Sequence, residues 1–248
     1  MVRKFGNLLF KKNNLMELRI SYLILAVLVG FIIPVYSMFG AGEKIKEAIL
    51  ESPELRTSMY VQSIIFQWIM VGLILLSLFY NGDSVDNIGL KFLNQPFLIL
   101  GLFGGSILSL WLFDNFDIPK LNMEKFKKRY KDVMFLIPTN QKEHNWAVAI
   151  SFTAGICEEI IFRGFTFWQL NQFLPIIPSV LIVNLLFALS HFATKMKNMV
   201  FAFLFGIFWS MIFIWTGSLW LAMLMHIIID LYSLTRGKKY FEKINSQV

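Results

Sequence analysis

The amino-acid sequence predicts an all-α fold, a polytopic transmembrane bundle of about seven to eight helices. The chain of 248 residues is 56% hydrophobic, with a mean hydropathy of +0.61. Only 16% of its residues are charged, whereas a soluble domain carries roughly 25%. Its apolar stretches reach the length of about 20 residues that a membrane helix needs. A disordered chain, a fibrous repeat and an ordinary cytosolic enzyme are therefore excluded.

Seven apolar segments predict the membrane helices. In chain order they are residues 20–39, 57–82, 92–113, 146–172, 176–194, 198–216 and 218–235. Lipid offers no hydrogen-bond partners to the backbone, so each segment should be helical. Pro175 and Gly217 mark turns between consecutive segments. The first segment is longer than the apolar part of a signal peptide and lacks a clear cleavage site, which indicates a retained helix.

The distribution of basic residues suggests an orientation. The net charge is +7, and the Lys and Arg residues lie between apolar segments, as the positive-inside rule describes. We expect the basic segment 114–145 to lie on the anionic inner leaflet rather than to bind nucleic acid. A cytoplasmic basic tail at 236–248 then places the N-terminus outside, despite its own Lys and Arg residues. One crossing among residues 1–95 is therefore miscounted, so the prediction is seven to eight helices.

Charged residues are rare inside the predicted helices. An ionised group at the bilayer centre costs a few kcal/mol, so such residues are candidates for function. The four charged residues and two histidines within the segments are Glu158, Glu159, Arg163, His191, His226 and Asp230.

Three of these residues share one predicted helix. Glu159 and Arg163 are four residues apart and can pair on one helix face. Glu158 lies about 100° around the same helix. Arg163 compensates only one carboxylate strongly, which leaves Glu158 as the proton acceptor. A purely structural ion pair joining helices would not need the second carboxylate.

Two further helices supply polar residues. Asn184, Phe187 and His191 recur at intervals of three and four, which places them on one stripe. His226 and Asp230 are four residues apart, an arrangement in which a carboxylate orients an imidazole or both bind one metal. We expect all three helices to contribute to one buried polar site.

The residue types leave two kinds of chemistry open. A glutamate with two histidines can activate water directly, or through zinc in a His-His-carboxylate site. Hydroxide formed in this way can attack a peptide carbonyl. The same groups could serve as a proton relay in a transporter.

Three motifs in order resemble those of the CAAX-processing and bacteriocin-processing (CPBP, or Abi) family of intramembrane proteases, which includes the type II CAAX prenyl endopeptidases. Residues 158–163 form the pattern E-E-x-x-x-R, residues 187–191 form F-x-x-x-H, and residues 226–230 form H-x-x-x-D. The resemblance covers about residues 145–235. It implies a catalytic core at 146–235. Hydropathy and charge divide the rest of the chain into N-terminal transmembrane helices at 1–113, the interfacial segment 114–145 and a cytoplasmic tail at 236–248.

The resemblance implies roles for these residues. Glu158 would be the base that activates water, and His191 would help to hold that water. Glu159 and Arg163, with Phe187 and Asn184, would support the site, while His226 and position 230 would stabilise the oxyanion. Zinc or another divalent metal could be held by Glu158, His191 and His226, and a metal-free mechanism is equally open.

Position 230 departs from the prenyl-protease branch, which has Asn where this chain has Asp. An ionised Asp accepts hydrogen bonds and cannot donate one to an oxyanion. This departure favours a bacterial membrane protein that processes peptides or gives bacteriocin immunity. Its expected partners are the bilayer and a membrane-associated peptide or protein, not nucleic acid.

Two other functions remain as alternatives. One is a membrane immunity protein of the same fold that binds without cleaving. The other is a proton-coupled transporter. Transporters often contain internal repeats, and the sequence has no repeat of this kind.

Overall fold

The structure, a computed structural model, describes residues 20–33, 43–92, 130–194 and 196–245, together with residues 104, 124 and 128. These residues form helices and connecting turns, without a strand among them. In chain order the elements are α2 (Ile20–Val27), η1 (Leu28–Ile32), α4 (Glu43–Glu51), α5 (Pro53–Asn81), η2 (Val85–Ile88), η3 (Met134–Leu136), α8 (Gln141–Glu158), η4 (Glu159–Thr166), α9 (Phe167–Phe173), α10 (Ile176–Ser190), η5 (Phe192–Thr194), α11 (Met196–Thr216) and α12 (Trp220–Asn245).

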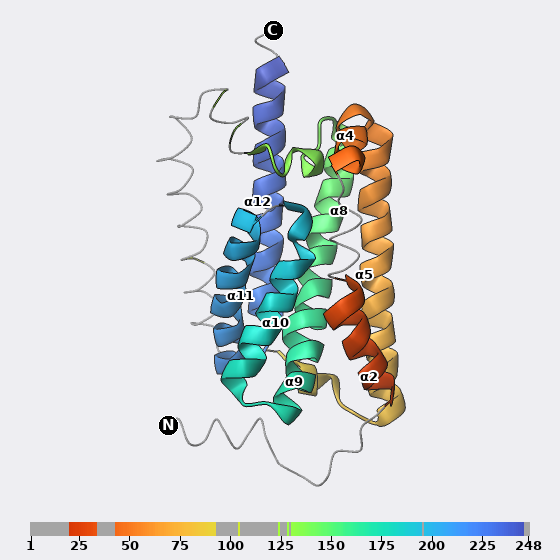
Figure 1. The fold of residues 1–248 in the computed structure, drawn as a ribbon, viewed down its shortest axis with the longest axis vertical. Helices are drawn as coiled ribbons and strands as arrows, with labels where there is room; N and C mark the ends of the chain where they lie inside the picture. Colours follow the sequence, from red (N-terminus) through yellow and green to blue (C-terminus); the bar gives the residue numbers. More distant parts are fainter. Residues whose placement is uncertain are drawn as a thin grey trace.

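Helix α8 is central to this arrangement. It packs most extensively against α12 and α5, and α10 packs against α11. Figure 1 shows α5, α8 and α12 as long rods, with α10 and α11 on one side. Because η4 and α9 continue α8 directly, one helical element carries the E-E-x-x-x-R motif through the bundle.

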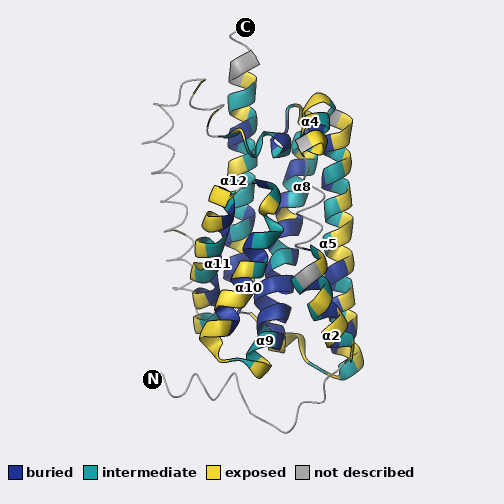
Figure 2. Ribbon diagram, viewed as in Figure 1, coloured by how far each residue is buried: buried dark blue, intermediate teal, exposed yellow. Residues whose placement is uncertain are grey.

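Two described helices are long and apolar enough to cross a membrane, Glu54–Asn81 and Met196–Thr216. Two shorter apolar helices are Ile20–Gly30 and Ile176–Ser190. Large hydrophobic side chains are exposed along the outer faces, including Phe66 and Phe208, and Figure 2 shows this pattern on α5 and α11. Exposed apolar surface of this extent is typical of membrane or protein contact.

The predicted turns coincide with helix ends. Helix α9 ends at Phe173, and Pro175 is the N-cap residue of α10. Between α11 and α12, Gly217 has a φ of 66°, which favours glycine. The Ser218 hydroxyl then donates to the backbone oxygen of Lys91 at 2.7 Å. The turn is thus tied to the loop that follows α5.

Several boundaries differ from the prediction. Helix α12 continues to Asn245, so the described part of the basic tail extends the last helix rather than forming a separate segment. Sequence reasoning also missed α4, a short helix with a mixed pattern of charged and apolar residues. Nearly all of the predicted span 92–113, and the basic segment up to residue 129, lie outside the described residues apart from a few single positions.

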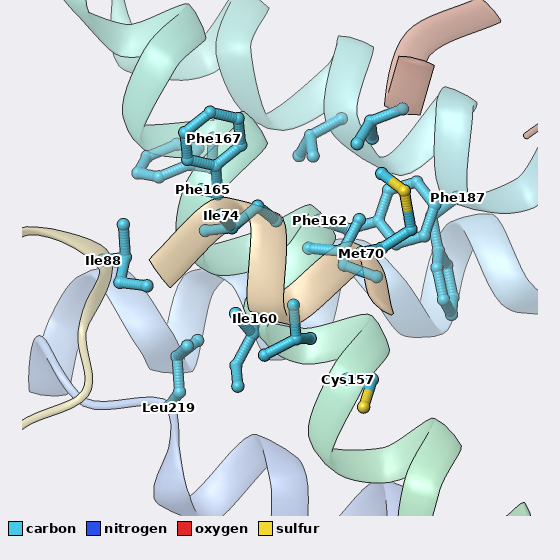
Figure 3. Close-up of a cluster of buried hydrophobic side chains, with 14 of the residues drawn as sticks. Met70, Ile74, Ile88, Cys157, Ile160, Phe162, Phe165, Phe167, Phe187 and Leu219 are labelled. Carbon is cyan, nitrogen blue, oxygen red and sulfur yellow. The ribbon is translucent and has the colours of Figure 1, made fainter. Parts of the chain in front are cut away.

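The apolar core surrounds η4. Its buried members include Phe162, Phe165 and Phe187, and the rings of Phe162 and Phe187 lie 5.3 Å apart in an edge-to-face contact. Figure 3 shows this cluster, with Met70 of α5 beside the same aromatic side chains. The core therefore fixes the segment that carries Glu159 and Arg163.

Candidate active site

The two adjacent glutamates lie on either side of a change in helix type. Glu158 is the last residue of α8, and Glu159 begins the π-helical segment η4. The wider turn is visible where the Phe167 backbone N–H donates to the carbonyl oxygen of Phe162, five residues earlier. Segments of π-helix are rare and occur frequently at functional sites.

Glu159 is the structural member of the pair. Its Oε1 accepts a hydrogen bond from Arg163 Nη1 at 2.9 Å, and His226 Nδ1 also lies 2.9 Å from it. The side chains of Glu159 and Arg163 are each only 2% exposed. One carboxylate oxygen therefore connects the arginine of η4 to the imidazole of α12.

Glu158 has a different environment. Its side chain is 19% exposed, and its Oε2 lies 3.9 Å from His226 Nε2. The Asp230 Oδ2 atom lies 3.7 Å from the same nitrogen, and that side chain is 35% exposed. Since Nδ1 faces Glu159, the other ring nitrogen of His226 lies between the carboxylates of Glu158 and Asp230, whose side chains are more exposed than that of Glu159.

Phe187 links the two histidines. Its ring centroid lies 4.7 Å from that of His191 and 6.1 Å from that of His226. The Arg163 guanidinium stacks 4.0 Å from the same ring. His191 follows the last residue of α10, and its Nδ1 lies 2.9 Å from the Phe187 carbonyl oxygen. Both imidazoles therefore flank one phenyl ring.

Asn184 lies in the packing layer behind the site. It is fully buried, and its amide nitrogen donates to Ser210 Oγ of α11 at 2.9 Å. At Gly206 of the same helix, an added Cβ would lie 2.3 Å from Asn184 Oδ1 and 2.9 Å from Arg163 Nη2. The small residue leaves space for both side chains, so Asn184 and Arg163 both lie against Gly206, and Asn184 is buried rather than at the exposed face.

Close contact between α8 and α12 brings their motifs together. At Gly155, an added Cβ would lie 2.8 Å from the backbone nitrogen of Ile227. Gly155 is three residues before Glu158, and Ile227 directly follows His226. The absence of a side chain at Gly155 thus allows the approach of the two helices beside the candidate active site.

Sequence reasoning missed one polar side chain at the site. Gln67, in the middle of α5, donates from Nε2 to Glu158 Oε1 at 3.4 Å. Gln67 has no formal charge, so a search for charged residues in the membrane segments passed over it. The signal that could have found it is an amide in an otherwise apolar helix.

A second polar cluster was also missed. Arg56 Nη1 lies 2.8 Å from Glu143 Oε2, and both side chains are buried. The same carboxylate oxygen accepts from the backbone N–H of Thr139 at 2.7 Å. Because both charged residues lie just outside the predicted spans, their burial was not apparent. This pair ties α5 to the start of α8, away from the candidate active site.

A metal-binding arrangement is not formed in the described part of the chain. There, no group of three His, Cys, Asp or Glu side chains is placed to hold an ion. His226 Nδ1 is already directed at Glu159. The three expected donors, Glu158, His191 and His226, therefore do not form a ligand set in this geometry.

Comparison with known proteins gives one family match. Residues 140–232 match the model of the family described as type II CAAX prenyl endopeptidase Rce1-like. All the candidate residues lie within that range except Gln67. No curated protein and no solved structure matches the chain.

Proposed function

Because residues 140–232 belong to the Rce1-like family of type II CAAX prenyl endopeptidases, we propose that this protein is an intramembrane endopeptidase. It hydrolyses a peptide bond in a membrane-associated peptide or protein. The family is a family of proteases and is membrane-embedded.

The difference between Glu158 and Glu159 carries the proposal. Glu159 is buried and engaged by Arg163 and His226, so it has no capacity left for an incoming water molecule on Oε1. The Glu158 side chain is 19% exposed, against 2% for Glu159, and its buried Oε2 has, like Glu159 Oε2, no hydrogen-bond partner among the described residues. A partly exposed carboxylate beside an imidazole can act as a general base toward water.

The proposed reaction follows from these positions. Glu158 Oε2 accepts a proton from water, and the water oxygen attacks the peptide carbonyl carbon. His226 Nε2, when protonated, donates a hydrogen bond to the oxyanion that forms. As the C–N bond breaks, Glu158 returns its proton to the leaving amine. The products are a carboxylic acid and an amine, and Glu158 ends the reaction in its starting protonation state.

The remaining residues assist this reaction. The His191 and His226 rings lie 4.7 Å and 6.1 Å from the same Phe187 ring, between centroids, which supports a role for His191 beside His226 in holding the water. Glu159 fixes the orientation of His226 through its contact with Nδ1. We assign this orienting role to Glu159, because Asp230 contacts only Nε2, at 3.7 Å.

The proposed mechanism uses no metal ion. Zinc would act as a Lewis acid and would lower the pKa of a bound water molecule. The side chains that would hold it are Glu158, His191 and His226, and they do not converge as a ligand set. Water activation is therefore assigned to Glu158 itself.

The proposed location is a bacterial cell membrane, crossed by seven to eight helices. The exposed apolar faces of α5 and α11 support contact with lipid. The end of α12 carries Arg236, Lys238 and Lys239 and lies at the same end of the bundle as α4 (Figure 1). The positive-inside rule then places the C-terminus in the cytoplasm.

The substrate is proposed to be a peptide of the bacteriocin-processing or self-immunity type. Asp230 supports this choice, because it places a carboxylate 3.7 Å from His226 Nε2. An ionised carboxylate does not donate to an oxyanion, as the Asn of the prenyl-protease branch can. The alternative substrate class is a prenylated peptide, which the description of the matched family names.

Cleavage assays test the proposal directly. Two probes are used with the purified protein in lipid nanodiscs: a quenched fluorescent peptide farnesylated at a C-terminal CAAX motif, and the same peptide without the farnesyl group. Glu158→Gln should lower cleavage by at least about 100-fold, since Gln keeps the shape but cannot take a proton. Its abundance in the membrane should equal that of wild type.

The comparison separates an enzyme from a binding protein. Loss of cleavage in Glu158→Gln with unchanged abundance supports the protease. Full cleavage by this variant would overturn the assignment of Glu158. Immunity to a bacteriocin that persists in Glu158→Gln would favour the non-catalytic binding protein.

A further inference from the structure

We infer that Gln67 of α5 is a positioning residue for Glu158, an inference that rests on the proposed function. Gln67 Nε2 donates to Glu158 Oε1 at 3.4 Å. The residue lies outside the matched range 140–232, so the site extends to a helix that the family match does not include.

The contact divides the two oxygens of Glu158 between different tasks. Oε1 is held by the amide of Gln67. Oε2 has no hydrogen-bond partner among the described residues and lies 3.9 Å from His226 Nε2. A carboxylate anchored at one oxygen keeps the other in a fixed direction, which favours proton transfer from a single water position.

The cost of placing Gln67 in α5 supports a role at the site. The helix is apolar enough to cross a membrane, and a buried amide without a full set of partners is costly there. The Oε1 atom of Gln67 is buried and has no donor among the described residues. Among the described residues, the one hydrogen bond of this amide goes to Glu158.

The direction of the amide follows from the chemistry of its partner. An ionised carboxylate can only accept hydrogen bonds, so Gln67 must present its NH2 group to Glu158. Arg163 donates from Nη1 to Glu159 rather than to Glu158. On α12, His226 and Asp230 approach the other side of the site. Gln67 is thus the neutral donor that fixes Glu158 without neutralising it.

Three substitutions at this position test the inference with the cleavage assay above. Gln67→Met removes the amide at similar length, and kcat should fall about tenfold with KM nearly unchanged, as expected for losing a hydrogen bond to a charged group. Gln67→Glu places a second carboxylate beside Glu158, so kcat should fall further in this variant than in Gln67→Met. Gln67→His keeps a donor and should recover part of the lost kcat.

Two control variants are available on the same helix. Gln62 is exposed, and its amide donates to Ser58 Oγ at 3.1 Å. Trp68 Nε1 donates to Thr153 Oγ1 at 3.3 Å, which is a second contact between α5 and α8. Gln62→Met and Trp68→Phe should leave kcat near the wild-type value. A tenfold loss in either control would overturn the inference, because general weakening of α5 would then explain Gln67→Met.

A double-mutant cycle on thermal unfolding tests the contact without any substrate. If Gln67 holds Glu158, the decreases in Tm for Gln67→Met and Glu158→Met will not add in the double variant. Additive decreases would overturn the contact. Wild-type kcat in Gln67→Met, alongside an inactive Glu158→Gln, would overturn this inference alone. Full activity in Glu158→Gln would instead remove the proposed function.

Discussion

His226 Nδ1 and Glu159 Oε1 lie 2.9 Å apart, which joins α12 to the buried carboxylate of η4. The same oxygen accepts from Arg163. One atom thus serves an ion pair and an imidazole, while the neighbouring Glu158 has a side chain that is 19% exposed, against 2% for Glu159. Two glutamates adjacent in sequence therefore have different environments and should respond differently to the same substitution.

The first prediction compares Glu159→Gln with Glu158→Gln. Glu159→Gln removes the negative charge that compensates a buried Arg163, so abundance and Tm should fall along with activity. Glu158→Gln should lower activity alone, because its side chain is partly exposed. Quantitative immunoblotting of membranes and thermal unfolding of the purified proteins measure the difference. Equal stability of the two variants would contradict the assignment of Glu159 as structural.

The second prediction concerns Arg163→Met. Removing one partner of a buried pair leaves an uncompensated charge and costs about 3–5 kcal/mol. The variant also loses the guanidinium that stacks on Phe187 at 4.0 Å. We expect low abundance and a large decrease in Tm.

Adding Glu159→Gln to that variant provides the internal control. The double variant no longer has an uncompensated buried carboxylate, so its Tm should be higher than that of Arg163→Met. If Glu159→Gln/Arg163→Met is less stable than Arg163→Met, charge compensation is not the role of this pair.

The third prediction tests the approach of α8 to α12. In Gly155→Ala the new Cβ meets the Ile227 backbone at 2.8 Å, and backbone cannot give way as a flexible side chain does. The helices must separate, at a cost of about 1–3 kcal/mol in unfolding free energy, and cleavage should fall because Glu158 moves from His226. At Gly72 of α5 an added Cβ meets nothing within 4 Å, so Gly72→Ala is the control and should retain wild-type Tm and activity.

The positions of several helices could be predicted from the sequence, because membrane segments are recognised by their length and hydropathy. The segments 146–172, 176–194 and 198–216 agree with α8 to α9, α10 and α11 within a few residues. The end of α12 could not be predicted in the same way. Its basic residues signal the membrane boundary, which does not require the helix to stop there.

Parts of the site were accessible for a related reason. Charged residues and histidines are so rare in these segments that Glu158, Arg163 and His226 could each be identified as candidate site residues. The spacing of Glu159 and Arg163 predicted their ion pair, and the structure contains it. Contacts between helices that are distant in the sequence could not be predicted. Nothing in the spacing indicates that Glu159 reaches His226, or that Gln67 from α5 lies against Glu158.

The final prediction concerns Asp230 and the use of a metal. If zinc is bound, Asp230 is a ligand or orients His226, and Asp230→Asn should lower metal binding and activity by roughly tenfold or more. In the structure, however, Glu159 holds Nδ1 of His226, while Asp230 lies 3.7 Å from Nε2 with its side chain 35% exposed. Asn at this position can donate to an oxyanion without having to be protonated first.

We therefore expect Asp230→Asn to keep its activity to well within tenfold of wild type, with activity extending toward alkaline pH. Wild type should be insensitive to a chelator. The measurement is the cleavage rate against pH for both proteins, with and without chelator. Chelator-sensitive wild-type activity together with an inactive Asp230→Asn would reverse the mechanism: the metal would then activate the water, and Asp230 would act on the ion or on His226.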